Sequence, residues 1–135
     1  MRFIFFAGGL FTAAALFFSA CGTNPYQTGE RLYKRYCSDC HMDTGEGLSA
    51  LIPSLAKSDF MAANRDRLPC IIRYGLQQDS ITVNGKIYAE QMPSMPSLSE
   101  IQITNLLNFI NTSWGNKNQV YNLEDVKALL EKCKK

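Results

Sequence analysis

The sequence predicts an all-α fold of three to five helices with one small β-hairpin near residues 81–88. Apolar side chains recur at three- and four-residue spacing in residues 28–40 and again in residues 99–115, and this spacing places them on one face of a helix. The dipeptide Asn84-Gly85 strongly favours a two-residue turn between two strands. A chain of 135 residues accommodates one domain.

The first predicted helix, residues 28–40, carries Leu32, Tyr33 and Tyr36 on its apolar face, with charged residues between them. The stretch that follows, residues 42–53, contains two glycines that allow turns. We therefore expect a loop after the first helix.

Two shorter helices are predicted next, at residues 57–64 and 67–75. Pro69 is tolerated in the first turn of the second one. Gly75 is a residue type that commonly ends a helix. The predicted hairpin comes directly after this point.

The last part of the chain predicts a loop and two helices. Two prolines interrupt the stretch QMPSMPS, residues 91–97, and exclude regular structure there. Ser99 and Gln102 match a capping box, which opens the long helix at residues 99–115. A short final helix is expected at residues 123–134.

The first twenty residues predict an export signal, residues 1–20. Arg2 precedes an apolar run that ends in small residues before Cys21, the order typical of such signals. The stretch resembles a bacterial lipoprotein signal. That resemblance implies that Cys21 becomes a lipidated N-terminus and that residues 21–27 form a tether to a domain at residues 28–135.

An uncleaved membrane anchor is the alternative, because the apolar run approaches the roughly 20 residues that span a bilayer. Both interpretations place the domain outside the cytoplasm. We expect a protein of the bacterial cell envelope that is tied to a membrane and faces the periplasm or the cell surface.

The residues from Cys21 onward carry nearly balanced charge. They include all but one of the 14 basic residues and all 12 acidic residues, so 13 less 12 gives a formal net charge of +1. The sequence shows no basic block beyond the terminal lysines and no interleaving of aromatic and basic residues. Nucleic acid is therefore not indicated as a partner.

The motif CSDCH places two thiols and an imidazole within residues 37–41, and His41 is the only histidine of the chain. A dithiol redox pair, part of a zinc site and a covalently attached haem all use such residues. Zinc is disfavoured because a structural site takes four ligands and the other cysteines stand far apart. A thioredoxin-like pair is disfavoured because it belongs to an α/β chain, whereas this motif ends a helix.

Haem accounts for all three side chains of the motif. Cys37 and Cys40 can form thioethers to the two vinyl groups of one porphyrin, and His41 then directs its imidazole at the iron. The export signal strengthens this interpretation, since haem is attached covalently on that side of the membrane. We therefore predict one covalent haem c.

The iron needs a second axial ligand, and methionine is the remaining soft donor because the chain has no second histidine. Met61, Met92 and Met95 are the candidates. Met61 lies in a predicted helix, where a core position is expected, and the other two each precede a proline. Met92 has more residues before Ser99 in which to cross the haem face, which favours Met92 over Met95.

Residues 26–115 resemble a class I cytochrome c. The residues that carry the resemblance are Gly29, Tyr33 and Cys37 at a spacing of four, Leu106 and Phe109 in the long helix, and Pro53 and Leu55 after the motif. In this family the glycine and the aromatic residue let the first and last haem-packing helices cross. The resemblance therefore implies a cytochrome c fold around one haem.

The resemblance also implies roles for individual residues. The Pro53 carbonyl is expected to accept the Nδ1 hydrogen of His41, so that Nε2 faces the iron. The family places its sixth ligand fourteen residues before the helix-packing leucine, which is Met92 in this sequence, with Met95 as the alternative. The Asn-Gly hairpin, the Met-Pro loop and SWGN at residues 113–116 look like the bacterial subgroup that serves copper nitrite reductases, sulfite-oxidising enzymes and oxidases.

Three further side chains are candidates for the haem environment. Tyr88 is expected either to donate a hydrogen bond to a haem propionate or to pack in the hairpin. Arg73 is expected either to pair with a propionate or to be a solvated charge on its helix. Trp114 is expected to cover the core near the haem or the first helix.

Cys70 and Cys133 remain once Cys21 and the two motif cysteines are assigned. Disulfides persist in the compartment that an export signal implies, so we predict that these two cysteines form one, tying the final helix to residues 67–75. A crosslink over so long a loop contributes roughly 4 kcal/mol in the chain-entropy model. Two separate buried thiols are the alternative.

The sequence thus predicts an electron carrier with one covalent haem c and His/Met axial ligation. Its expected partners are oxidoreductases or terminal oxidases and reductases. No Ser-His-Asp set or pair of acids surrounds the motif, so no catalytic residue is predicted. A haem-based sensor or peroxidase-like enzyme with an open sixth site is the alternative, and a fixed redox subunit of a larger enzyme is a third possibility.

Overall fold

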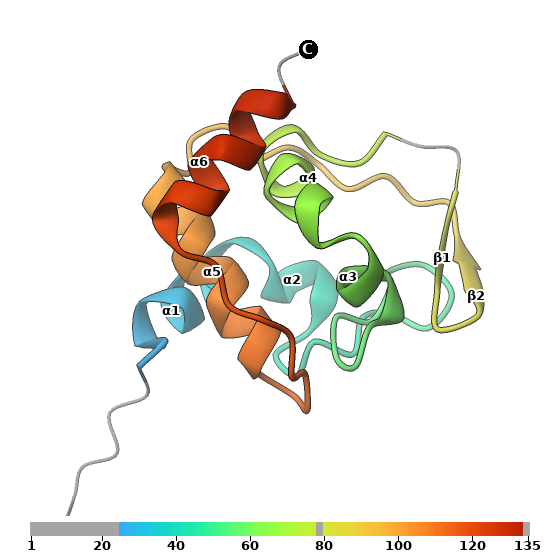
Figure 1. Cartoon of the computed structure of the whole chain (residues 1–135). Coiled ribbons are helices and arrows are strands. Elements are labelled where there is room, and N and C mark those ends of the chain that lie inside the picture. Colours follow the sequence, from blue (N-terminus) through green and yellow to red (C-terminus); the bar gives the residue numbers. More distant parts are fainter. Residues whose placement is uncertain (1–24, 78–79, 134–135) are drawn as a thin grey trace, which may run out of the picture.

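A computed structural model describes residues 25–77 and 80–133 (Figure 1). Its elements are α1 (Gln27–Tyr36), α2 (Ser38–His41), α3 (Asp59–Ala63), the 3₁₀ helix η1 (Arg65–Arg67), α4 (Leu68–Tyr74), β1 (Ile81–Val83), β2 (Lys86–Tyr88), α5 (Glu100–Thr112) and α6 (Leu123–Lys132). The predicted helical fold with one small hairpin is confirmed. The predicted export signal and Cys21 lie outside the described residues.

The first predicted helix is divided in two at Cys37. The Cys37 backbone leaves the helical region, with φ −125° and ψ −35°, so the described residues form six α-helices where the sequence predicted at most five. The second of them, α2, ends at His41, and the next residue, Met42, has a φ of +61°. The Tyr33 hydroxyl donates to the Met42 carbonyl at 2.6 Å and ties α1 to the end of α2.

The helices α1 and α5 cross at Gly29. A side chain at this position would overlap the Asn105 carbonyl and the Phe109 side chain on α5, so only glycine permits this approach. Beside the crossing, the buried Tyr33 ring packs against the rings of Phe109 and Trp114, with centroids 5.6 and 4.8 Å away. The crossing that the family resemblance implied is therefore present.

The hairpin pairs β1 with β2 in antiparallel register, with Ile81 opposite Tyr88 and Val83 opposite Lys86. Both turn residues, Asn84 and Gly85, have positive φ, which matches the strand twist that favours Asn-Gly. The tip is tied to the start of α3. The Asn84 N–H donates to the Asp59 carboxylate at 2.6 Å, and the Asp59 N–H donates to the Asn84 side-chain oxygen at 3.1 Å.

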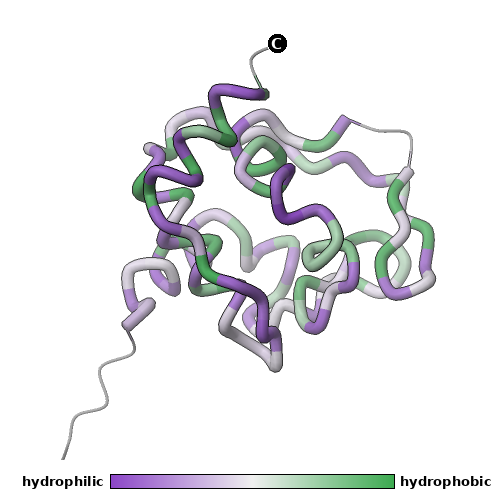
Figure 2. The backbone as a smooth tube through the Cα atoms, in the orientation of Figure 1, coloured by the Kyte–Doolittle hydropathy of each residue, from purple (hydrophilic) through white to green (hydrophobic). Residues whose placement is uncertain are grey.

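The two C-terminal helices begin at side-chain caps. Ser99 and Gln102 form the predicted capping box at the start of α5. The Asn122 side chain accepts the Asp125 N–H at the start of α6 (2.8 Å). Hydrophobic and hydrophilic residues alternate along α6 (Figure 2), and its apolar residues Val126 and Leu130 are buried. The long helix ends at Thr112, three residues before the predicted end at Gly115, because Ser113 is extended.

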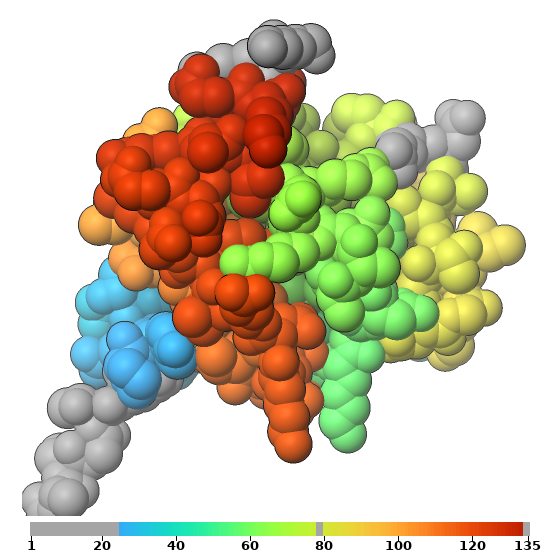
Figure 3. Space-filling view, in the orientation of Figure 1, coloured from blue at the N-terminus to red at the C-terminus, as the bar shows by residue number. Residues whose placement is uncertain are grey.

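A disulfide joins Cys70 on α4 to Cys133 at the end of α6, with 5.8 Å between their Cα atoms. In the space-filling view the C-terminal helix lies directly against α4 and α5 (Figure 3). The crosslink thus holds the last described element of the chain against the middle of the fold. Within residues 25–77 and 80–133, no helix has the length and apolar character needed to cross a membrane.

Removing both sulfurs of the crosslink with Cys70→Ser and Cys133→Ser should lower the free energy of unfolding by roughly 4 kcal/mol, because the unfolded chain regains the entropy of the opened loop. Denaturant titration of the haem-containing protein measures this loss. Lys127→Ser, on an exposed part of α6, is the control and should change it little. Native protein in which Cys70 and Cys133 are both alkylated without reductant would contradict the crosslink.

Candidate haem site

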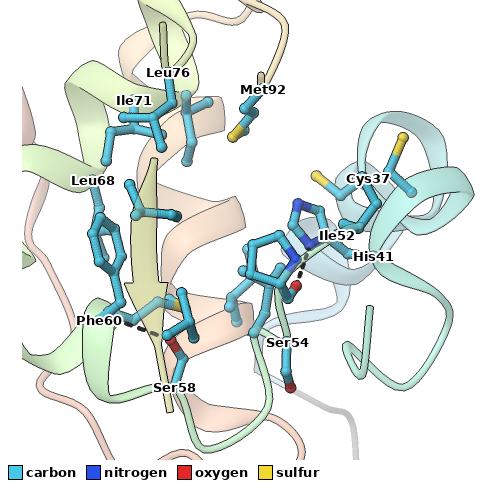
Figure 4. A pocket seen from close by; sticks show the side chains of 18 of the residues that line it. Cys37, His41, Ile52, Ser54, Ser58, Phe60, Leu68, Ile71, Leu76 and Met92 are labelled. Carbon is cyan, nitrogen blue, oxygen red and sulfur yellow. Dashed lines mark hydrogen bonds between the residues drawn. The ribbon is translucent and has the colours of Figure 1, made fainter. Parts of the chain in front are cut away.

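An apolar cavity lies between α2 on one side and α4 with residues 90–95 on the other (Figure 4). Its empty space, counted together with its open mouth, is about 1070 Å³. Helix α5 supplies the floor. The apolar side chains of its wall include Ile52, Leu68, Ile71, Ile72, Leu76, Val83, Leu106, Leu107 and Ile110.

His41, the last residue of α2, is buried in one wall of this cavity. Its Nδ1 lies 3.1 Å from the Pro53 carbonyl oxygen. Because that carbonyl can only accept, Nδ1 carries the hydrogen and Nε2 keeps its lone pair. Burial lowers the pKa of His41 below its ordinary value, although the Pro53 hydrogen bond acts in the opposite direction. The imidazole is therefore neutral at neutral pH, as an iron ligand must be.

The two motif cysteines also line the cavity, but they differ in exposure. Cys37 is buried and Cys40 is exposed. Burial, with a smaller contribution from Cys40, raises the pKa of the Cys37 thiol to about 12. A redox-active dithiol needs a thiolate with a lowered pKa, so this environment disfavours the thioredoxin-like interpretation.

Zinc is disfavoured on the same geometry. Across the part of the chain that the structure describes, no three His, Cys, Asp or Glu side chains are grouped so that they could hold a metal ion. A flat apolar cofactor fits better, since the cavity wall is hydrocarbon almost throughout and His41, Cys37 and the exposed Cys40 all line it.

All three candidate methionines contact the cavity, and they enter it from different places. Met92 lies across from His41, with its sulfur directed into the space between them (Figure 4). Met95 lines the wall three residues further on, and Met61 is buried on α3, as expected for a core residue. The predicted sixth ligand and its alternative therefore both belong to the segment that faces the imidazole.

The other candidates for the haem environment, Tyr88, Arg73 and Trp114, do not line the cavity. The Tyr88 ring is buried, and its hydroxyl donates to the Ser49 carbonyl at 3.3 Å. The Nε of Arg73 is buried and has no hydrogen-bond acceptor among the described residues. A bond from either residue to a propionate stays a prediction. Trp114 packs on Tyr33 and Phe109, so it covers the first helix as expected.

Sequence reasoning missed the partner of the Met92 backbone. The main chains of Leu76 and Met92 form an antiparallel bridge, with N···O distances of 2.9 and 3.2 Å. Neither stretch reads as a strand, because residues 91–97 hold two prolines and Gly75 marks a helix end. The regular spacing of apolar residues carries no signal for a single bridge of this kind.

The comparisons with known proteins agree with this site. The family described as "Cytochrome C oxidase, cbb3-type, subunit III" matches residues 24–110. Cytochrome c-552 of Thermus thermophilus is 33% identical over 113 residues, which cover 77% of this chain and 85% of the relative.

Two further relatives are subunits of dehydrogenases. The cytochrome c subunit of the quinone alcohol dehydrogenase of Gluconacetobacter polyoxogenes is 32% identical over 103 residues, 73% of this chain and 21% of the relative. The gluconate 2-dehydrogenase cytochrome c subunit of Pantoea cypripedii is 35% identical over 92 residues, 67% of this chain and 21% of the relative. This chain thus spans about a fifth of their length. With the matches over most of its own length, the chain belongs to the cytochrome c family and is an electron carrier rather than a catalyst.

Proposed function

We propose that this protein is a monohaem electron carrier in which His41 and Met92 are the axial ligands of the iron. The observation that carries the proposal is the arrangement of one cavity. The His41 imidazole and the Met92 sulfur face each other across it (Figure 4). Cys37 and Cys40 also line it. Haem c supplies the one-electron couple when it is bound.

The protein's own residues prepare this couple in three ways. The Pro53 carbonyl fixes the tautomer of His41 and keeps Nε2 available. A thioether sulfur at the sixth position favours ferrous over ferric iron and raises the potential. The apolar wall excludes water, and two ligands retained in both oxidation states leave little to rearrange when an electron moves.

We propose an oxidoreductase as the redox partner. The dehydrogenase cytochrome c subunits among the relatives support this class of partner, but each of them is about five times the length of the matched segment. A carrier that passes one electron and leaves needs only a small, transient contact, at the low end of interface sizes. Co-purification from membranes separates such a carrier from a fixed subunit.

We also propose that the domain is held at a membrane by a lipid on Cys21 and faces the periplasm or the cell surface. The support is the order of residues before Cys21, one basic residue followed by an apolar run and small residues. The described domain begins with α1 only a few residues later, so a short tether suffices.

Covalent attachment predicts that acid-acetone extraction leaves the red colour with the polypeptide. Cys37→Ala combined with Cys40→Ala should yield an unstable, colourless product, because most of the apolar wall then surrounds unfilled space. Absorbance of the two phases and thermal melting measure the outcome. Colour that moves wholly into the acetone phase of the unaltered protein would exclude thioethers.

Ligation by Met92 predicts different results for two neighbouring substitutions. Met92→Ala should abolish the weak sulfur-to-iron absorption band of the oxidised protein, lower the potential and let carbon monoxide bind the reduced protein. Met95→Ala is the matched control and should keep the band. The reverse pattern would assign the ligand to Met95. Carbon monoxide binding by the unaltered protein would instead favour a sensor or peroxidase-like enzyme with an open sixth site.

Lipidation predicts a defined mass for the protein isolated from membranes. Intact mass spectrometry should show loss of residues 1–20 and a gain equal to the acyl chains on Cys21. Cys21→Ser should leave the signal uncleaved and the mass unmodified. A membrane-bound wild-type product that retains residues 1–20 would instead identify an uncleaved anchor.

A further inference from the structure

The two faces of helix α4 have different contacts. Ile71 and Ile72 are buried and line the cavity. Cys70 faces away from it and is bonded to Cys133 at the end of α6. One face of this short helix is therefore cavity wall, and the other is fixed to the C-terminal helix by a covalent bond.

The C-terminal end of α4 and the two residues after it hold the backbone that carries Met92. The Leu76 N–H donates to the Met92 carbonyl at 2.9 Å, and the Met92 N–H donates to the Leu76 carbonyl at 3.2 Å. The Met95 N–H donates to the Ile72 carbonyl at 3.0 Å. Residues 90–95 have no regular secondary structure. The Ile72 carbonyl of α4 and the Leu76 backbone just after α4 therefore hold them through these three bonds.

Gly75 sets how closely the two segments approach. Its φ is +80°, and a Cβ atom built on it would lie 2.5 Å from the Met92 carbonyl oxygen and 3.0 Å from the Ser94 nitrogen. Both atoms belong to the backbone, so no side-chain rotation relieves the overlap. A residue larger than glycine has to push the Met92 segment away from α4.

We propose that Gly75, Cys70 and Cys133 are positioning residues for the sixth iron ligand. Gly75 lets the Met92 backbone pack closely against the end of α4, and the Cys70–Cys133 disulfide holds the face of α4 that is turned away from the cavity. None of these three residues lines the cavity, so each acts on the ligand only through the backbone. The proposal rests on the His41–Met92 ligation proposed above and adds the means by which Met92 is held. It predicts that loss of support lengthens or opens the bond from the Met92 sulfur to the iron while the haem stays attached.

The first test compares Gly75→Ala with Gly85→Ala. Both glycines have positive φ (+80° and +75°), so both alanines carry backbone strain, and the strain at Gly75 includes its ψ of 179°, a combination that essentially only glycine adopts. A Cβ at Gly85 meets nothing within 4 Å. Gly75→Ala should weaken the sulfur-to-iron band and raise the carbon monoxide-bound fraction of the reduced protein about tenfold. Gly85→Ala should leave both as in the unaltered protein. Equal behaviour of the two variants would overturn the role of Gly75.

The second test removes the Cys70–Cys133 disulfide. It also tests the support of Met92 by α4 if Gly75→Ala does not accumulate with haem. Cys70→Ser with Cys133→Ser should raise the carbon monoxide-bound fraction at a temperature where circular dichroism shows the protein folded. Val126→Ala, a truncation at a buried position on α6, controls for lost stability and should not raise it. An unchanged band in the serine variant would overturn the role of the disulfide.

Failure of this proposal can be distinguished from failure of the proposed His41–Met92 ligation. If Met92→Ala keeps the band of the unaltered protein, Met92 is not the ligand and the proposed ligation is wrong. If Met92→Ala loses the band while Gly75→Ala and the double serine variant both keep it, the ligation stands and the support by α4 is wrong.

Discussion

The apolar cavity constrains the rest of this structure. Much of its wall is irregular chain, residues 42–58 and 89–98, and such segments need partners for their backbone polar groups. Asn116 supplies several of them. Its amide donates to the carbonyls of Leu55 and Ile110 at 2.9 and 2.8 Å, and its oxygen accepts the Lys57 N–H at 2.7 Å. One buried side chain thus joins the loop after the motif to the end of α5.

The polar groups nearest the cavity are turned away from its centre. The His41 Nδ1 donates to Pro53, and the Ser58 hydroxyl accepts the Met61 N–H. These groups are satisfied inside the wall, so the space faces mainly hydrocarbon, the imidazole Nε2 and the sulfur atoms of the cysteines and methionines that line it. A low local dielectric follows, and it strengthens the influence of these few groups on a charge placed there.

Local features of this fold were predictable from sequence, and long-range ones were less so. The hairpin turn at Asn84-Gly85 and the capping box at Ser99 depend on residues that are neighbours in sequence, so both could be predicted from the local sequence. The break at Cys37 was missed because Tyr36 and Cys37 continue the apolar spacing of α1. The Tyr33 hydroxyl binds the Met42 carbonyl just beyond the break, a contact that the spacing does not indicate. Of the candidate site, the motif and the facing segment were predictable, whereas the backbone bridge that carries Met92 depends on a contact that no local pattern encodes.

The contrast between the motif pair, Cys37 and Cys40, and the disulfide pair, Cys70 and Cys133, bears on how the protein matures. The proposed thioethers require Cys37 and Cys40 to reach the haem as thiols while Cys70 and Cys133 become oxidised. The first pair is separated by three positions and the second by 63. Short loops close at the lowest entropic cost, so an unfolded chain oxidises the unwanted pair more readily. Correct pairing of the four thiols therefore depends on the order of events. Reducing conditions or early thioether formation would first protect the motif cysteines, and docking of α6 would then bring Cys70 and Cys133 together.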